Sequence, residues 1–383
     1  MVMAIAAVAV VLAVSFFTFN LINDSSDADP ATSGTCGTDV TWDYDASTKT
    51  LTIGGTGTTM DDYNDTTTRP GWDWLDIENV VISGSVTHIG KFAFYNCTAL
   101  TSVDLSVVDV IGRNAFMGCS SLTSVDLSNP TFIDDNAFWH CTALTSVEIP
   151  ATVDMGTAVF GYCTALTEIN VDDANPNWKS VSGILFTKDG TKLAQYPAGK
   201  TDTSYTVTVE EIRPGAFTGC SSLISVDLSG VKKIRGVVFD SCVSLEEVKN
   251  SSGVISIELY AFSNCTALTS IDLSGLNSIP QRAFYNCSSL KEVITPNVKN
   301  IGSYAFYHCD SLETINLSNT ESIDVAAFSR CGSLTTVDLS SVKTLGPYAF
   351  NTTGLTGTVE IPNIESCSEA VFASCLSLEG IVV

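Results

Sequence analysis

A motif that recurs about every 22 residues constrains this chain more than any other feature. Its first clear copy consists of Ile89, Gly90, Ala93, Phe94, Cys97, Leu100, Val103 and Leu105. The cysteine of the motif returns at steps of 22 residues, apart from one step of 23, one of 44 and one of 57: Cys97, Cys119, Cys141, Cys163, Cys220, Cys242, Cys265, Cys287, Cys309, Cys331 and Cys375. The step of 44 contains a copy in which Thr353 replaces the cysteine and Phe350 is retained. Chance does not produce such a register, so the chain is a repeat protein of about twelve units.

Each unit has two halves that differ in the spacing of their apolar residues. The half Leu-x-x-Val-x-Leu alternates at its end, as at Val103 and Leu105, which predicts a short strand with these side chains facing inward. The half Ala-Phe-x-x-Cys-x-x-Leu places apolar groups three residues apart, as at Phe94, Cys97 and Leu100. That spacing predicts one helical or 3₁₀ turn with a single buried face.

One such unit cannot bury its own apolar side, whereas stacked units share a continuous core. We therefore expect residues 88–383 to form a solenoid, with a parallel β-sheet on its concave face and short helical or 3₁₀ turns on its convex face. Twelve strands at a spacing of about 4.8 Å predict a sheet roughly 55–60 Å long.

The unit Ile-Gly-x-x-Ala-Phe-x-x-Cys-x-x-Leu-x-x-Val-x-Leu resembles the BspA-like leucine-rich repeats, also called the Treponema-type class. The resemblance covers residues 77–383, and the Ala-Phe-x-x-Cys turn stands where other leucine-rich repeats have an asparagine column. It implies a curved leucine-rich-repeat solenoid on a microbial cell surface, in a family linked to adhesion and protein–protein contact.

One long interruption separates Cys163 from Cys220, whose 57-residue step exceeds one repeat by 35 residues. Two apolar runs, residues 181–186 and 191–196, flank the pair Asp189-Gly190. Such a pattern predicts a β-hairpin. We expect an insert at about residues 175–210 that projects from the stack and leaves four units before it and eight after it.

The two ends of the solenoid are expected to differ. Residues 34–87 form a β-rich cap, with strands at 40–44 and 50–53, a half-repeat at 77–82, and Trp72 and Trp74 as lids over the core. At the other end, Leu378, Ile381 and Val383 belong to a repeat strand with no cap after it. Either the sequence is a fragment, or this end is a site of self-association.

The N-terminal residues 1–22 contain no charged side chain and are long enough to cross a bilayer as one helix. They are followed by a polar linker at residues 23–33. We expect either a single membrane anchor or a cleaved signal segment. The first basic residue is Lys49, so basic residues give little guidance on orientation, but the size and polarity of the remaining chain favour a position outside the cell. The protein is then displayed on the cell surface, or secreted if the segment is cleaved.

The net charge and the sequence motifs disfavour several classes of partner and of activity. A formal net charge of −24 disfavours nucleic acid and anionic membrane surfaces as partners. The three histidines, His88, His140 and His308, have no partner at a spacing that builds a triad or a metal site, and we found no hydrolase, P-loop or dinucleotide motif. We therefore expect no enzyme activity, no cofactor and no metal. The cysteine column predicts small buried thiols, with disulfides between neighbouring units as the alternative.

The candidate binding residues are those between the inward Val and Leu of each strand, because they face outward. They form a largely acidic column: Asp104, Asp126, Glu148, Asn170, Asp227, Asp272, Asn316, Asp338 and Glu360, with Lys249 and Ile294 as exceptions. Carboxylates in neighbouring strands repel one another and persist when water and salt screen them or when a cationic partner neutralises them. We expect this column to bind a protein or glycan on another surface. The alternative is a structural component of the cell envelope that assembles through the ends of the solenoid.

Overall fold

A computed structural model describes residues 31–64, 71–72 and 75–383. It confirms the predicted repeat solenoid. The predicted N-terminal segment 1–22 and Trp74 lie outside the described residues. Among the residues that are described, no helix has the length and apolar character needed to cross a membrane.

Two rows of short parallel strands run along the solenoid. The first row contains the predicted Leu-x-x-Val-x-Leu strands: β6 (Ser102–Asp104), β9 (Ser146–Ile149), β11 (Glu168–Val171), β17 (Ser225–Asp227), β19 (Glu247–Lys249), β21 (Ser270–Asp272), β23 (Glu292–Ile294), β25 (Thr314–Ile315), β28 (Gly357–Glu360) and β30 (Leu378–Val382). Strand β15 (Ser204–Thr206), from the predicted insert, joins this row by pairing with β17. The second row, which the sequence analysis did not anticipate, ends at the Ile of each Ile-Gly pair or at its equivalent: β5 (His88–Ile89), β7 (Val110–Ile111), β8 (Phe132–Ile133), β10 (Asp154–Met155), β16 (Glu211–Ile212), β18 (Lys233–Ile234), β20 (Ser256–Ile257), β22 (Ser278–Ile279), β24 (Asn300–Ile301), β26 (Ser322–Ile323), β27 (Thr344–Leu345) and β29 (Ser366–Cys367).

The turn half of each unit is a chain of tight turns rather than a continuous helix. In the copy around Phe284, alternate N–H groups bond within the unit and across to the next one: Tyr285 donates to the Arg282 carbonyl at 3.3 Å, and Phe284 donates to that of Ala305 at 2.8 Å. Arg282 and Asn286 have φ of 55° and 59°, a left-handed conformation that stops a 3₁₀ helix from continuing. One short 3₁₀ helix, η2 (Ser251–Gly253), follows strand β19.

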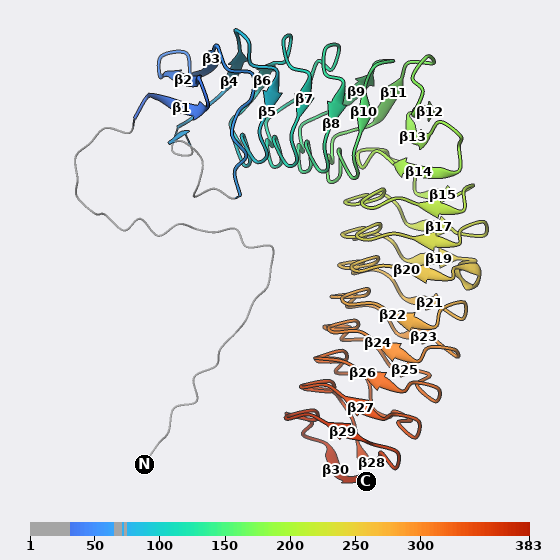
Figure 1. Ribbon diagram of the computed structural model, residues 1–383. Helices are drawn as coiled ribbons and strands as arrows, with labels where there is room; N and C mark the ends of the chain where they lie inside the picture. The colour runs from blue at the N-terminus through green and yellow to red at the C-terminus, as the bar shows by residue number, and fades with distance from the viewer. Residues whose placement is uncertain (1–30, 65–70, 73–74) are drawn as a thin grey trace, which may run out of the picture.

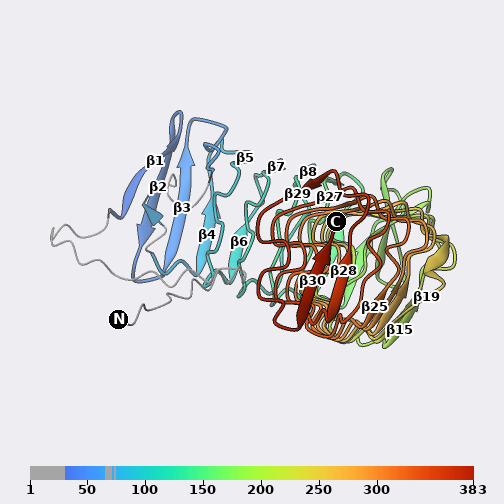
Figure 2. The same ribbon diagram turned by 90° about the horizontal axis from the view of Figure 1, so that it is seen from below.

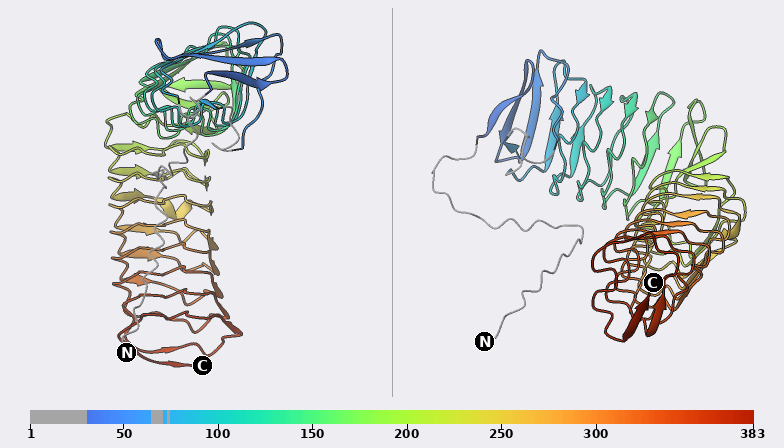
Figure 3. Two further views of the ribbon diagram at one scale, coloured as in Figure 1. Left: turned by 90° about the vertical axis from the view of Figure 1, so that its left-hand side faces the viewer. Right: turned by 60° about the horizontal axis from the view of Figure 1, so that its bottom comes forward.

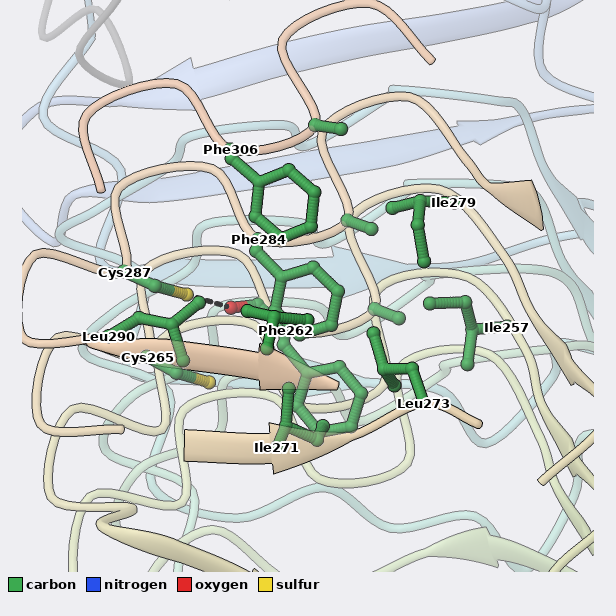
Figure 4. Packing of buried hydrophobic residues seen from close by; sticks show 14 of the residues in the cluster. Ile257, Phe262, Cys265, Ile271, Leu273, Ile279, Phe284, Cys287, Leu290 and Phe306 are labelled. Atoms are coloured by element: carbon green, nitrogen blue, oxygen red, sulfur yellow. Dashed lines mark hydrogen bonds between the residues drawn. The ribbon is translucent and has the colours of Figure 1, made fainter. Parts of the chain in front are cut away.

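Stacked phenylalanine rings form the centre of the core (Figure 4). Phe284 is fully buried, and its ring centroid lies 5.3 Å from that of Phe262 on one side and 5.3 Å from that of Phe306 on the other. The cysteine of each unit lies beside this stack, and the Cys287 thiol donates to the Phe262 carbonyl of the preceding unit at 3.1 Å. None of the thirteen cysteines, all of which lie in the described part of the chain, forms a disulfide. The column therefore stabilises the stack through buried thiols, as the first of the two sequence interpretations expected.

The N-terminal cap closes the first ring stack. Its strands are β1 (Ser33–Gly37), β2 (Val40–Asp45), β3 (Thr50–Gly55) and β4 (Asn79–Ile82), which join β6 in one five-stranded sheet. Trp72 is fully buried and stacks on Phe94 with ring centroids 5.9 Å apart, so it acts as the predicted lid. At the other end, β30 pairs with β28 in a two-stranded sheet, and Leu376 is 95% exposed.

The insert does not project from the stack, contrary to the sequence analysis. It is a three-stranded meander of β12 (Trp178–Val181), β13 (Ile184–Thr187) and β14 (Lys192–Gln195), in which the predicted hairpin is β13–β14. Strand β14 then pairs in parallel with β16, so the insert continues the second strand row. Its residues Ile184, Leu185 and Phe186 are all buried, which explains why it stays in the stack.

The insert divides the molecule into two arms that meet at an elbow (Figure 1). The rings stack separately in each arm, from Trp72 to Phe160 in the first and from Tyr196 to Phe372 in the second. Figure 2 looks along the second arm onto β28 and β30, and Figure 3 shows that arm as a nearly straight stack.

The turn segments of the two arms meet on the inner side of the elbow. The Tyr162 hydroxyl donates hydrogen bonds to the Asp240 carboxylate and, at 2.8 Å, to the Ser241 hydroxyl. Gly215, with a φ of 70°, has room for no side chain, because a Cβ there would lie 2.7 Å from the Cβ of Ala158. The repeat pattern predicts the Leu-x-x-Val-x-Leu sheet on a concave face, but at the elbow the turns occupy the inner side (Figure 1). We therefore call the outward side of that sheet the strand face.

The buried carboxyl of Asp240 gives the elbow a pH dependence. Burial raises the pKa of Asp240 above its ordinary value, although Tyr162 and Asn264 donate hydrogen bonds to it. Because the pKa of Asp240 is higher in the folded state than in the unfolded state, ionisation of this group lowers the free energy of unfolding. This destabilisation grows as the pH rises from the unfolded-state pKa to the folded-state pKa. We expect Asp240→Asn to increase the free energy of unfolding at about pH 7 and to have little effect at about pH 3, where both forms are neutral. Urea unfolding at the two pH values measures this.

Asp338→Asn is the matched control, because the pKa of Asp338 is lowered, chiefly by the Ser340 hydroxyl that bonds to it. Its ionised form favours folding, so the substitution should cost a little stability at neutral pH, opposite in sign to Asp240→Asn. If Asp240→Asn also lowered the free energy of unfolding at neutral pH, ionised Asp240 would not oppose folding.

Candidate interaction surface

The structure places all nine predicted binding residues at the surface. Strand β9 illustrates the alternation, because Ser146 and Glu148 are exposed whereas Val147 and Ile149 are buried. The nine residues are each exposed or half-exposed on the strand face: Asp104, Asp126, Glu148, Asn170, Asp227, Asp272, Asn316, Asp338 and Glu360.

Most of these residues also have a local structural role that the sequence analysis missed. One side-chain oxygen accepts a hydrogen bond from the backbone N–H of the serine two residues later, which forms an Asx turn. The donor–acceptor distances are 2.9–3.0 Å in all six such turns, at Asp104, Asp126, Asp227, Asp272, Asn316 and Asp338. The recurring Asp-Leu-Ser triplet was the available signal. The second oxygen of each carboxylate is left for other contacts.

The Asx hydrogen bonds favour the ionised forms of Asp104 and Asp126. The backbone N–H groups of Ser106 and Ser128 are the main reason that the pKa values of Asp104 and Asp126 lie below the ordinary range. The charge of Asp104 acts in the other direction on Asp126, which shows that carboxylates of successive units feel each other. The Asp104 and Asp126 carboxylates therefore repel each other in the folded protein at neutral pH.

The acidic column is continuous only in the first arm. Asp104, Asp126 and Glu148 occupy the same position in three consecutive units, and we call them the acidic strip. In the second arm the column is interrupted, since Lys249 lies opposite Asp227 and forms an ion pair with Glu247 at 3.2 Å, and Ile294 lies opposite Asp272.

Neighbouring elements limit the acidic strip at both ends. On one side β4 of the cap pairs with β6, which places Val81 opposite Asp104. On the other side Asn170 donates to Glu148 at 2.9 Å, and the turn between β12 and β13 packs on β11, where the Ile169 N–H donates to the Gly183 carbonyl at 2.9 Å. The strip is thus a short, defined patch rather than the whole length of the solenoid.

The histidines lie in separate surroundings. His140 stacks on Tyr162 at the elbow, with ring centroids 4.2 Å apart, and His88 bonds to the Thr87 hydroxyl at 2.8 Å. His308 has a partner that the sequence analysis did not foresee, because its Nδ1 lies 3.0 Å from a carboxylate oxygen of Asp310, while Arg330 bonds to its Nε2 at 2.9 Å. Within the described part of the chain, no three His, Cys, Asp or Glu side chains are grouped as metal ligands.

Several solved structures that resemble this chain come from bacteria. A leucine-rich repeat protein from Eubacterium ventriosum is 24% identical, with a TM-score of 0.71 over 85% of this chain and 96% of that one. A leucine rich cell surface protein from Faecalibacterium prausnitzii is 24% identical, with a TM-score of 0.43 over 92% and 95% of the two chains. A leucine-rich repeat protein from T. pallidum is 25% identical, with a TM-score of 0.28 over 60% and 88%. No curated protein matches the sequence.

The family comparison covers most of the solenoid. Residues 72–187, 200–297 and 266–379 match the BspA type leucine rich repeat region, in six copies. Between Trp72 and residue 379, the match leaves out only residues 188–199, which belong to the insert. The chain belongs to the BspA-type leucine-rich-repeat family.

Proposed function

We propose that this chain is a non-enzymatic extracellular module that binds a protein with a basic surface through the acidic strip. The observation that carries the proposal is the set of three carboxylates at one position of consecutive units, Asp104, Asp126 and Glu148, each exposed on the strand face. Mutual repulsion makes this arrangement unfavourable in the free protein. A cationic partner relieves that repulsion on binding, which favours association and steers the approach of the partner.

The rigidity of the strip supports the proposal. The carboxylates of Asp104 and Asp126 are fixed by their Asx turns at 3.0 and 2.9 Å, and Glu148 is fixed by the Asn170 amide at 2.9 Å. Side chains that are already ordered lose little conformational entropy when a partner binds. An extracellular location rests on the uncharged residues 1–22, which serve as an anchor for display on the cell surface, or as a signal for secretion if they are cleaved.

Charge neutralisation within the strip tests the proposal. Asn316 accepts the same Asx hydrogen bond as the aspartates, so Asp104→Asn and Asp126→Asn keep the turns, and Glu148→Gln completes the neutral triple variant. We expect this variant to bind a folded basic probe protein, such as lysozyme, about tenfold more weakly at low salt, or about 1.4 kcal/mol. Surface plasmon resonance over a range of salt concentrations measures the change, and the salt dependence should become shallower.

The control has the same net charge. Asp272→Asn, Asp338→Asn and Glu360→Gln together remove three carboxylates from the strand face of the second arm, where the column is interrupted. This variant should retain most of the affinity. Equal losses in the two triple variants would mean that net charge alone attracts the probe, and the strip would then have no special role.

A further inference from the structure

A polar groove crosses four consecutive units near the end of the second arm. It lies just before strands β24, β26, β27 and β29 (Figure 1) and has a volume of about 630 Å³. Val298, Thr320 and Val342 point into the core and are fully buried, so the residues on either side of them point outward and form two walls. The floor of the groove is therefore backbone.

The first wall is a row of anchored amides and one hydroxyl. The Asn297, Asn319 and Asn363 side chains each donate one hydrogen bond to a carbonyl of the preceding unit, at 2.7, 2.8 and 2.7 Å, and the Ser341 hydroxyl does the same at 2.5 Å. Each anchored amide still has one N–H and its oxygen for a ligand.

This row begins abruptly in the chain. The three preceding units have Gly230, Gly253 and Gly275 at the corresponding position. Since glycine satisfies the fold at this position, the polar side chains that follow are not required by the solenoid itself. The groove exists because they replace glycine in successive units.

The second wall is a row of alternating charges, Lys299, Glu321, Lys343 and Glu365. Glu321 forms ion pairs with both lysines, at 3.3 Å to Lys299 and 2.8 Å to Lys343. The Lys343 ammonium is the main reason that the pKa of Glu321 is lowered. In a chain with a net charge of −24, this wall has no net charge and its charges compensate one another.

The geometry points to a neutral, hydroxyl-rich ligand, and we propose that the groove binds a segment of an uncharged glycan. Amides, a hydroxyl, ammonium groups and carboxylates offer both donors and acceptors in a line, which matches hydroxyl groups that act as both. A charged ligand would have to compete with the internal ion pairs. A peptide is disfavoured because the walls consist of polar and charged side chains and offer no apolar pocket for its side chains.

The regular spacing favours a polymer over a small molecule. Neighbouring units are about 4.8 Å apart, so equivalent side chains of the first and fourth units lie about 14 Å apart. Each unit presents one amide or hydroxyl on one wall and one charged group on the other. An extended chain of repeating sugars can therefore make similar contacts in each unit. The proposed glycan groove differs from the acidic strip in its position on the solenoid and in the class of its ligand.

Asn319→Gly tests the groove without a foreign residue, because glycine occupies the equivalent positions of earlier units. We expect NMR titration with neutral gluco- and manno-oligosaccharides to show binding to the natural chain, and this variant to bind about tenfold more weakly, as expected for the loss of two hydrogen bonds. The matched control is Asn129→Gly, since the Asn129 amide also donates to a carbonyl of the preceding unit, that of Val108 at 2.9 Å, but lies between Val107 and Ala151 in the first arm. The control variant should bind as the natural chain does.

Three outcomes would overturn the proposal. They are the absence of binding by every neutral oligosaccharide, an equal affinity for the anionic polymer oligogalacturonate, and an equal loss in Asn319→Gly and Asn129→Gly. A second variant, Glu321→Gln with Lys343→Met, should lose binding as well, because it removes the central ion pair while keeping the size of both side chains.

Discussion

Replacing Phe284 with alanine is expected to lower the free energy of unfolding by about 3–5 kcal/mol. The ring is fully buried and stacked on both faces, against Phe262 and Phe306, so its removal leaves a cavity in the centre of the second arm. Because each unit of a solenoid contacts only its neighbours, this cavity weakens one interface in the middle of the stack. We therefore expect urea unfolding to become less cooperative, with the two ends of the arm unfolding separately, and circular dichroism should record a broader transition.

Phe132→Ala is the control for this effect. Phe132 belongs to β8, but its side chain is 38% exposed and lies outside the ring stack. Its loss should change the free energy of unfolding by about 0.5 kcal/mol or less, as for most surface substitutions. If the two variants lost similar stability, the ring stack would not be the main source of cohesion between the units.

The fold was largely predictable because every unit repeats the same pattern of buried side chains. A phenylalanine, a cysteine and a leucine at fixed offsets bury one face, and each of the inferred core positions is buried in the copy that contains Phe284, Cys287, Leu290 and Val293. Even the exception at Thr353 keeps the pattern, since its hydroxyl bonds to the Phe350 carbonyl at 2.9 Å. The second strand row was missed because each strand spans only two residues, too short for an alternation to be visible in sequence.

The insert and the elbow were less predictable because they depend on contacts between distant residues. The sequence gives the hairpin signal at Asp189-Gly190, but nothing local indicates that β14 pairs with β16 or that Tyr162 reaches Asp240, 78 residues away. Alternation alone correctly predicted that the residues of the acidic column face outward. The Asx turns and the limits of the acidic strip at β4 and the insert required the structure, because neighbouring elements decide which part of the column is accessible.

Thiol accessibility in the folded protein should differ strongly among the thirteen cysteines. Cys367 is exposed, Cys97 and Cys375 are half-buried, and the other ten are buried. Burial raises the pKa of Cys141 to about 12, three units above its ordinary value, which reduces the reactive thiolate about a thousandfold before access is considered. We expect Ellman's reagent at about pH 8 to label one thiol per chain rapidly and two more slowly, while the buried thiols react only as the protein unfolds.

Cys367→Ser should abolish the rapid phase without altering the others, because Cys367 lies at the surface and outside the cysteine column. In denaturant all thirteen thiols should react, whereas disulfides between neighbouring units would reduce that number by two for each bond. The hydrogen bonds of the buried thiols favour reaction of all thirteen. Each buried column thiol from Cys119 to Cys331 points at a carbonyl oxygen of the preceding unit, at 3.1–3.3 Å in all cases except Cys220, where the distance is 4.0 Å. A sulfur engaged in this way would have to rotate away from its acceptor to form a disulfide, and the thiol hydrogen bond to the carbonyl would be lost.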